Sequence, residues 1–144
     1  MIIDLNLNFE EHINGILKES NKKLRALKRI SKYLSEDKLR LVMKTFIESQ
    51  FNYCPLIWMC HSRDLNRRIN ELHERALMVV YKQTNLTFEQ LLEKDNSFTI
   101  HERNFQKLAI EMYNVKHNLC PKRVQEISKL VKKGPNGQSY RRIL

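Results

Sequence analysis

Apolar residues along this chain recur every three or four positions, which is the spacing of helices rather than of strands. Between residues 9 and 33, this spacing puts Ile13, Leu17 and Leu24 on one helical face. The same periodicity predicts further helices over 36–53, 63–81, 88–92 and 100–118, and a last short helix after Pro121. Glycine occurs only at positions 15, 134 and 137, which leaves little provision for hairpin turns. We therefore predict an all-α bundle of about five to six helices.

Residues that cap or stop helices mark the ends of these segments. Four helix starts carry a capping residue or motif: Ser35, Ser62, the capping box of Thr87 and Gln90, and Thr99. Pro55 is expected to end the second helix, because proline disrupts a helix interior. The segment 56–59 is apolar throughout, so we expect it to be buried on all sides, with Trp58 in the core.

The same periodicity assigns core positions to the later helices. In the second helix they are Leu39, Val42, Phe46 and Tyr53. In the third helix they are Leu65, Ile69, Leu72, Ala76, Val79 and Val80. In the helix over 100–118 they are Phe105, Leu108, Ala109, Met112, Val115 and Leu119. Each set is a prediction about which side chains the fold buries.

The two ends of the chain differ from its helical middle. Met1–Leu7 contains the β-branched pair Ile2 and Ile3, which predicts a short strand without a partner strand in this chain. Residues 132–144 have turn chemistry and few apolar side chains, which predicts a mobile basic tail. We accordingly divide the chain into a strand segment (1–8), a helical domain (9–131) and a tail (132–144).

Charge is distributed unevenly along the sequence. The net formal charge is +10, with 26 Lys and Arg residues against 16 Asp and Glu residues. Residues 18–40 contain nine basic residues against three acidic ones, and residues 122–144 contain seven against one. A concentrated basic surface attracts phosphate by counterion release without reading base sequence. The charge therefore predicts contact with RNA or DNA, although a solvated lysine-rich helix face explains the same composition.

Two sets of basic residues are candidates for phosphate contact. The first lies opposite the apolar face of the first helix: Lys22, Arg25, Lys28, Arg29 and Lys32. The second and weaker set lies on the third helix: Arg67, Arg68 and Arg75. Acidic residues alternate with the second set, so ordinary ion pairing along one helix remains an equally good explanation for it.

The sequence offers no constellation for catalysis. Two-metal phosphoryl transfer needs carboxylates close together, and each aspartate of the chain is isolated. The adjacent acids are Glu10–Glu11 and Glu36–Asp37, and both pairs lie at helix starts where they stabilise the helix dipole. Glycine-rich phosphate loops are excluded by the shortage of glycine. We expect a chain that is not an enzyme on its own, with no cofactor and no small-molecule substrate.

The cysteines and histidines do not follow a metal-binding pattern. Cys54, Cys60, His61 and His73 are spaced unlike zinc ligands, so we expect buried thiols and a surface histidine and no metal. Three cysteines, an odd number, in apolar surroundings predict reduced thiols and an intracellular protein, with nucleus and cytoplasm left open. No apolar run approaches the roughly 20 residues of a membrane span, so no membrane partner is expected.

The order of segments over residues 3–127 resembles the C-terminal part of reverse transcriptases from non-LTR (LINE-type) retrotransposons. Five points carry the resemblance: Asn8-Phe9 with His12-Ile13, the block Ser49–Trp58, the motif Leu72–Leu77, Phe88–Asp95, and His101–Tyr113. None of them is a catalytic motif, and their shared order makes the match.

The resemblance implies a thumb and connector region. Met1–Leu7 would be the remnant of the last palm strand, and the helices from Phe9 onward would grip the template and the growing DNA. The paired aspartates of the palm lie upstream in the family and have no counterpart here, and the fingers are absent. RNA or DNA, and a palm and fingers domain of a parent polymerase, are the implied partners.

Together these observations predict a non-catalytic reverse-transcriptase fragment that binds RNA or DNA non-specifically through a basic helical face. An alternative is a degenerate, truncated transposon relic without an independent role. Another alternative is a docking domain for proteins, which an exposed apolar patch around Ile2, Ile3 and Phe9 would favour.

Overall fold

A computed structural model describes residues 9–59, 61–122 and 124 of the chain. The described residues form helices and contain no strand, so the predicted all-α class is confirmed. In chain order the helices are α1 (Glu10–Ile30), α2 (Glu36–Phe46), the 3-10 helix η1 (Glu48–Asn52), α3 (Pro55–Trp58), α4 (Arg63–Tyr81), α5 (Phe88–Asp95) and α6 (Ile100–Lys116). The predicted strand at Met1–Leu7, the helix proposed after Pro121 beyond residue 124, and the predicted tail from residue 132 lie outside the described residues.

The chain divides after Asn104 into two compact units, a division that the sequence did not predict. The first unit holds α1 to α5 and the first turn of α6. The second unit begins at Phe105 and holds the rest of α6. In the predicted helix 100–118 the core positions Phe105, Met112 and Leu119 are wrong, because their side chains are more than half exposed, and Ala109 is exposed as well.

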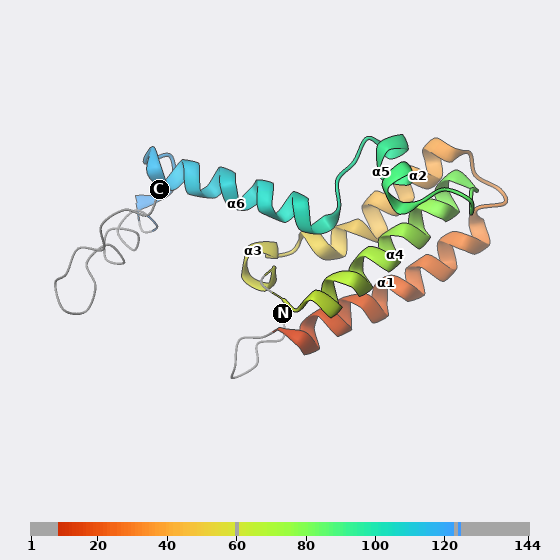
Figure 1. Ribbon diagram of the computed structural model, residues 1–144, viewed down its shortest axis with the longest axis horizontal. Coiled ribbons are helices and arrows are strands. Elements are labelled where there is room, and N and C mark those ends of the chain that lie inside the picture. The colour runs from red at the N-terminus through yellow and green to blue at the C-terminus, as the bar shows by residue number, and fades with distance from the viewer. Residues whose placement is uncertain (1–8, 60, 123, 125–144) are drawn as a thin grey trace. The chain divides into compact units, whose positions relative to one another are not determined.

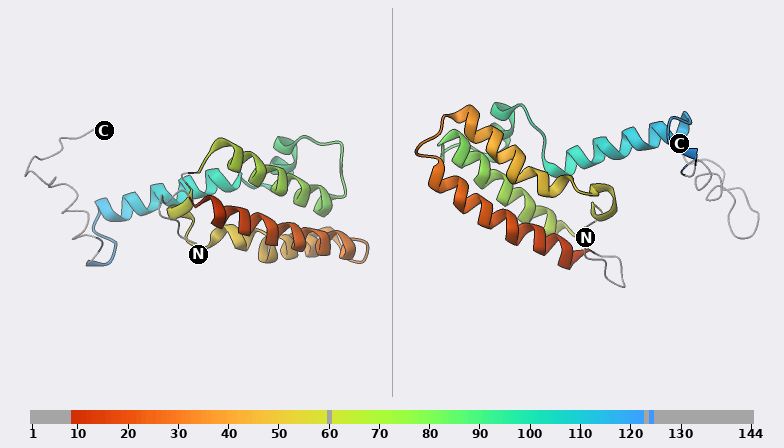
Figure 2. Two further views of the ribbon diagram at one scale, coloured as in Figure 1. Left: turned by 90° about the horizontal axis from the view of Figure 1, so that it is seen from below. Right: turned by 180° about the vertical axis from the view of Figure 1, so that it is seen from behind.

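Three helices build the core of the first unit. Helix α1 packs against both α2 and α4, α2 packs against α4, and α5 packs on α4. Figures 1 and 2 show α1, α2 and α4 side by side, each of the three lying next to the other two. Leu72, Ala76 and Leu77 of α4 are fully buried, as are Ile13 of α1 and Leu39 of α2. Burial of these apolar faces supplies the main stabilisation of the bundle.

The capping residues explain where several helices begin. The Ser62 hydroxyl accepts a hydrogen bond from the Leu65 amide at 3.3 Å at the start of α4. The Thr87 hydroxyl accepts from the Gln90 amide while the Gln90 side chain accepts from the Thr87 amide, which completes the predicted capping box of α5. Thr99 and Glu102 pair in the same way at α6. Ser35 precedes α2 as predicted, but its side chain makes no capping bond.

Replacement of Thr87 by alanine should therefore lower the free energy of unfolding by about 1 kcal/mol, since the Gln90 amide in the first turn of α5 loses its acceptor. Chemical denaturation of the purified chain measures this loss. Thr45→Ala is the matched control, because Thr45 is exposed within α2 and bonds only to carbonyls of its own helix. The control should change the free energy by less than about 0.5 kcal/mol. Equal losses in the two variants would contradict a capping role for Thr87.

The second predicted helix is shorter than expected. It ends at Phe46, and the chain continues as the 3-10 helix η1. Its buried side chains are spaced four residues apart: Leu39, Met43, Ile47 and Phe51. Phe46 and Tyr53 were assigned to the core and are 58% and 61% exposed, so those two assignments are wrong. Within α2 the helix already buries the face of Leu39 and Met43, and the row continues at Ile47, so Phe46 falls on the solvent side.

The segment after Pro55 is a single turn, α3, that holds Trp58 in the core. The Trp58 ring is 1% exposed, as expected, and its Nε1 donates a hydrogen bond to the Tyr53 carbonyl at 2.9 Å. Ile57 is 48% exposed, so burial of this segment on all sides is a wrong expectation. Cys54 is half-buried rather than buried.

Asp95 connects α5 to α2 and α4. Its carboxylate is fully buried and accepts hydrogen bonds from Arg40 Nε at 2.6 Å and from the Tyr81 hydroxyl at 2.7 Å. Arg40 also donates to the Asp95 carbonyl, and Lys44 Nζ lies 3.4 Å from the second carboxylate oxygen. We refer to Asp95, Arg40, Lys44 and Tyr81 as the Asp95 cluster. It joins three helices through one side chain.

A second buried carboxylate, Glu48 of η1, connects α4 to the start of α6. Arg103 donates to its Oε2, and His73 Nε2 lies 3.4 Å from its Oε1. The His73 ring packs edge-on against Phe88 with centroids 5.6 Å apart. His73 is 1% exposed, so the expected surface histidine is in fact part of the core. We refer to Glu48, His73 and Arg103 as the Glu48 cluster.

Candidate nucleic-acid interface

The solvent side of α1 is cationic over its last two turns. Arg25, Lys28, Arg29 and Lys32 are exposed, while Leu24 and Leu27 of the same helix are buried. Because 3.6 residues make one turn, positions 25, 28, 29 and 32 follow one face. Lys28 and Arg29 lie in the last turn, where basic side chains also stabilise the helix dipole. Part of this charge therefore has a structural role as well.

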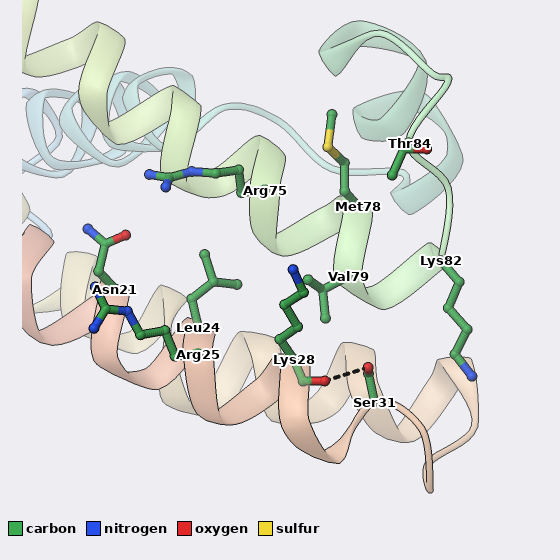
Figure 3. A pocket seen from close by; sticks show the side chains of 10 residues that line it. All are labelled: Asn21, Leu24, Arg25, Lys28, Ser31, Arg75, Met78, Val79, Lys82 and Thr84. Carbon is green, nitrogen blue, oxygen red and sulfur yellow. Dashed lines mark hydrogen bonds between the residues drawn. The ribbon is translucent and has the colours of Figure 1, made fainter.

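A hollow of about 510 Å³ lies between α1 and α4. Figure 3 shows its lining: Lys28 rises from α1 toward α4, Arg25 runs along α1 toward Asn21, and Arg75 extends from α4. Lys82 follows the end of α4 and completes the lining cations. The remaining lining side chains are Asn21, Leu24, Ser31, Met78, Val79 and Thr84. The hollow thus has an apolar base formed by α1 and α4, with cations from both sides.

A second and more open hollow of about 470 Å³ adjoins the first. It is lined by Arg25, Lys28, Arg29, Lys32 and Tyr33. Arg25 and Lys28 line both hollows, so the two form one continuous surface, which we call the basic groove. Six cations line the basic groove: Arg25, Lys28, Arg29, Lys32, Arg75 and Lys82. No acidic side chain is among its lining residues.

The cations of the basic groove are not neutralised by acidic side chains in the described part of the chain. Within residues 9–59, 61–122 and 124, none of the six forms an ion pair with a carboxylate. The Arg75 Nε donates to the Glu71 carbonyl one turn earlier at 3.1 Å, which fixes the stem and leaves its two terminal nitrogens for a ligand. Six like charges on one surface repel one another, and a bound polyanion would relieve that repulsion.

Two residues predicted to contact phosphate are instead paired with acids. Lys22 Nζ lies 2.6 Å from Glu19, and this hydrogen bond lowers the pKa of the Glu19 carboxyl. Arg67 bridges Asp64 and Glu71 on its own helix, and its hydrogen bonds to these acids raise its pKa. The pairing that the sequence left open for the second set therefore applies to Arg67. Arg68 is half-buried and lines neither hollow.

The structure adds two residues that the sequence analysis missed. Lys82 adopts a left-handed backbone conformation, with φ of 52°, directly after α4, and so lies next to α1. Tyr33 follows the end of α1 in a turn. Lys82 lies beyond the predicted helix 63–81, so face assignment by spacing could not include it. Tyr33 is the last residue of the predicted first segment, and its place beside the basic end of α1 was the available signal.

Other kinds of site find little support in the part of the chain that the structure describes. In those residues, no three His, Cys, Asp or Glu side chains are grouped as metal ligands. None of the described helices is both long and apolar enough for a membrane span. The apolar patch that would favour protein docking included Phe9, which is buried; Ile2 and Ile3 lie outside the described residues.

No protein-family model matches this sequence, and no curated protein or solved structure is significantly similar to it. The resemblance to non-LTR reverse transcriptases therefore stays a prediction from the five sequence segments given above.

Proposed function

We propose that this chain binds nucleic acid through the basic groove between α1 and α4. The observation that carries the proposal is the convergence of six cations from α1, α4 and the turns that follow them on one surface, without an acidic residue among the lining residues. Lys and Arg side chains in such an arrangement neutralise successive phosphates and release their counterions. Binding of this kind is independent of base sequence, since phosphate contacts position a strand but do not read it.

The proposal includes no catalytic role for the chain. Arg25, Lys28, Arg29, Lys32, Arg75 and Lys82 act as ligands for phosphate oxygens, and no acid that could hold a metal lines the basic groove. As a separate part of the proposal, the chain derives from the thumb and connector of a non-LTR reverse transcriptase. The order of the sequence segments supports this ancestry, and the binding proposal does not depend on it.

Salt dependence tests the binding proposal. If all six cations contact phosphates, the plot of log affinity against log salt should have a slope of about −4 for a single strand and about −5 for a duplex. The affinity should then fall about 300-fold or more between 50 and 200 mM salt. Fluorescence anisotropy with labelled 20-mers of RNA and DNA measures both quantities. An affinity that stays flat over this range would rule the proposal out.

A pair of substitutions on one helix tests the location of the site. Arg75→Gln should weaken binding about 3- to 10-fold and reduce the magnitude of the salt slope by about one, because one phosphate contact is lost. Arg67→Gln removes the same charge two turns earlier, from a side chain already paired with Asp64 and Glu71. It should change the affinity less than twofold. Equal effects of the two variants would show that only net charge matters and would remove the basic groove as the site.

A further inference from the structure

Tyr33 is a large aromatic side chain that the fold leaves in solvent. It is 85% exposed, the highest value among the exposed large apolar side chains of the described residues. Its backbone amide donates to the Ile30 carbonyl at 3.0 Å, which fixes the turn after α1 and the direction in which the side chain leaves it. The fold gains no burial from this ring, so packing does not explain an aromatic residue at this position.

The other residues that line the second hollow beside Tyr33 are all cations. Tyr33 lines one end of the basic groove together with Arg25, Lys28, Arg29 and Lys32. Within residues 9–59, 61–122 and 124, no other ring and no cation stacks on the Tyr33 ring, so its π face is open. An open aromatic face beside phosphate-binding cations is the pairing that surfaces for single-stranded nucleic acids combine.

Tyr81 shows what a structural tyrosine looks like in this fold. Its ring is 7% exposed, its hydroxyl donates to Asp95, and the Lys94 Nζ lies 4.6 Å from its ring centroid. Burial, followed by the hydrogen bond to Asp95, raises the pKa of Tyr81. Tyr33 shares none of these contacts. Its place at the end of a row of cations favours a ligand that has both negative charge and a flat apolar face.

We infer that the basic groove binds single-stranded RNA or DNA, with one unpaired base stacked on Tyr33 while the neighbouring cations hold the phosphates on either side of it. This inference rests on the proposed function and adds the substrate class to it. In a duplex the base faces are covered by their neighbours, so an aromatic side chain on the outside reaches only the backbone. Stacking on Tyr33 therefore discriminates in favour of strands with exposed bases, without preference for a particular base.

The test compares Tyr33→Ala, Tyr33→Phe and wild type in the full chain, by anisotropy with labelled 12-mers of oligo-dT, oligo-U and a 12-base-pair DNA duplex. Tyr33→Ala should weaken binding to both single strands by about 5- to 150-fold and change duplex binding less than twofold. Tyr33→Phe keeps the π face and should remain within about twofold of wild type on every ligand. The salt slope should stay unchanged in all variants, because no cation is removed.

Tyr53→Ala is the matched control, since Tyr53 is 61% exposed and lines neither hollow. It should leave all affinities unchanged. Because the Tyr33 side chain is exposed, its replacement should not unfold the chain, and a circular dichroism melt checks this. An equal loss on single strands and duplex, or no loss on either, overturns the inference while leaving groove binding intact. A wild-type chain that binds none of the three ligands overturns both proposals.

Discussion

Replacement of Asp95 by alanine should lower the free energy of unfolding by about 3–5 kcal/mol, because its carboxylate accepts hydrogen bonds from Arg40 and Tyr81 and each hydrogen bond to a charged group contributes roughly 1.5–3 kcal/mol. Asp95 is fully buried, and three side chains from two other helices point at it. Without it, the Tyr81 hydroxyl loses its acceptor in the core, and Arg40 loses its carboxylate. A loss of this size is a large fraction of the total stability of a small domain.

Asp64→Ala is the matched control for this prediction. Asp64 is also an aspartate that pairs with an arginine at 2.6 Å, but its side chain is 62% exposed. Its loss should cost less than about 0.5 kcal/mol, because exposed ion pairs contribute little. Urea denaturation followed by the fluorescence of Trp58 gives both values. Similar costs for the two substitutions would show that burial of the Asp95 cluster does not stabilise the fold.

The Asp95 cluster also sets a dependence of stability on pH. Burial alone would raise the pKa of the Asp95 carboxyl, but hydrogen bonds from Arg40 and Tyr81 outweigh it, and the pKa lies below its ordinary value. A carboxyl with a lowered pKa in the folded state contributes stability above its unfolded pKa and loses it as the pH falls through the folded pKa. Stability should therefore fall below about pH 4, the ordinary range for aspartate. In Asp95→Asn this part of the pH dependence should disappear.

The sequence predicted the helices and their starts but not the ionic clusters. Helix spacing and capping residues are local signals, so Arg63–Tyr81 and the capping box at Thr87 could be assigned without knowledge of the fold. The predicted helix over 88–92 stops short of Asp95, so no helical face was assigned to this residue. Its partner Arg40 lies 55 positions away, and only the packing of α2 and of α5 against α4 brings the two together.

The candidate site, too, could be predicted only in part from local sequence patterns. The row Arg25, Lys28, Arg29 and Lys32 follows from the periodicity of α1 alone. Arg75 joins that row only because α4 packs against α1. Arg67, two turns earlier on α4, forms ion pairs with Asp64 and Glu71. The spacing of residues along α4 gives no basis for distinguishing Arg67 from Arg75. Only the packing between helices makes the two arginines differ, so the sequence could not identify which cations would be available to bind phosphate.

The basic groove and the Asp95 cluster are independent in their residues. No member of the Asp95 cluster lines either hollow of the basic groove. Substitutions in the groove should therefore change affinity at constant stability, and substitutions in the cluster should change stability first. Binding measured on Asp95→Asn at a temperature where it is folded should match wild type, which separates a structural defect from a defect in the site.

The Glu48 cluster should show the second large effect. Glu48→Gln is expected to lower the free energy of unfolding by about 1.5–3 kcal/mol, the range for hydrogen bonds to a charged group. The Glu48 side chain is 5% exposed, whereas that of Arg103 is 26% exposed. Glutamine keeps the size and the polar atoms of Glu48, whereas alanine at position 95 also removes the acceptor of the buried Tyr81 hydroxyl. The expected loss therefore lies below that of Asp95→Ala. The control Glu71→Gln affects an exposed pair and should cost less than about 0.5 kcal/mol.

A double-mutant cycle assigns this loss to its contacts. If the bond from Arg103 carries most of the effect, Glu48→Gln and Arg103→Gln together should cost clearly less than the sum of the single costs.

Burial opposes ionisation of Glu48, but the interactions with His73 and Arg103 prevail and hold the pKa of the Glu48 carboxyl below its usual value. The contribution of this carboxyl is then complete above about pH 5 and declines as the pH falls through its lowered pKa. Two results would show that the fold does not depend on this connection between η1 and the first turn of α6. One is that the costs of the two single substitutions add. The other is that Glu48→Gln leaves the loss of stability at low pH unchanged.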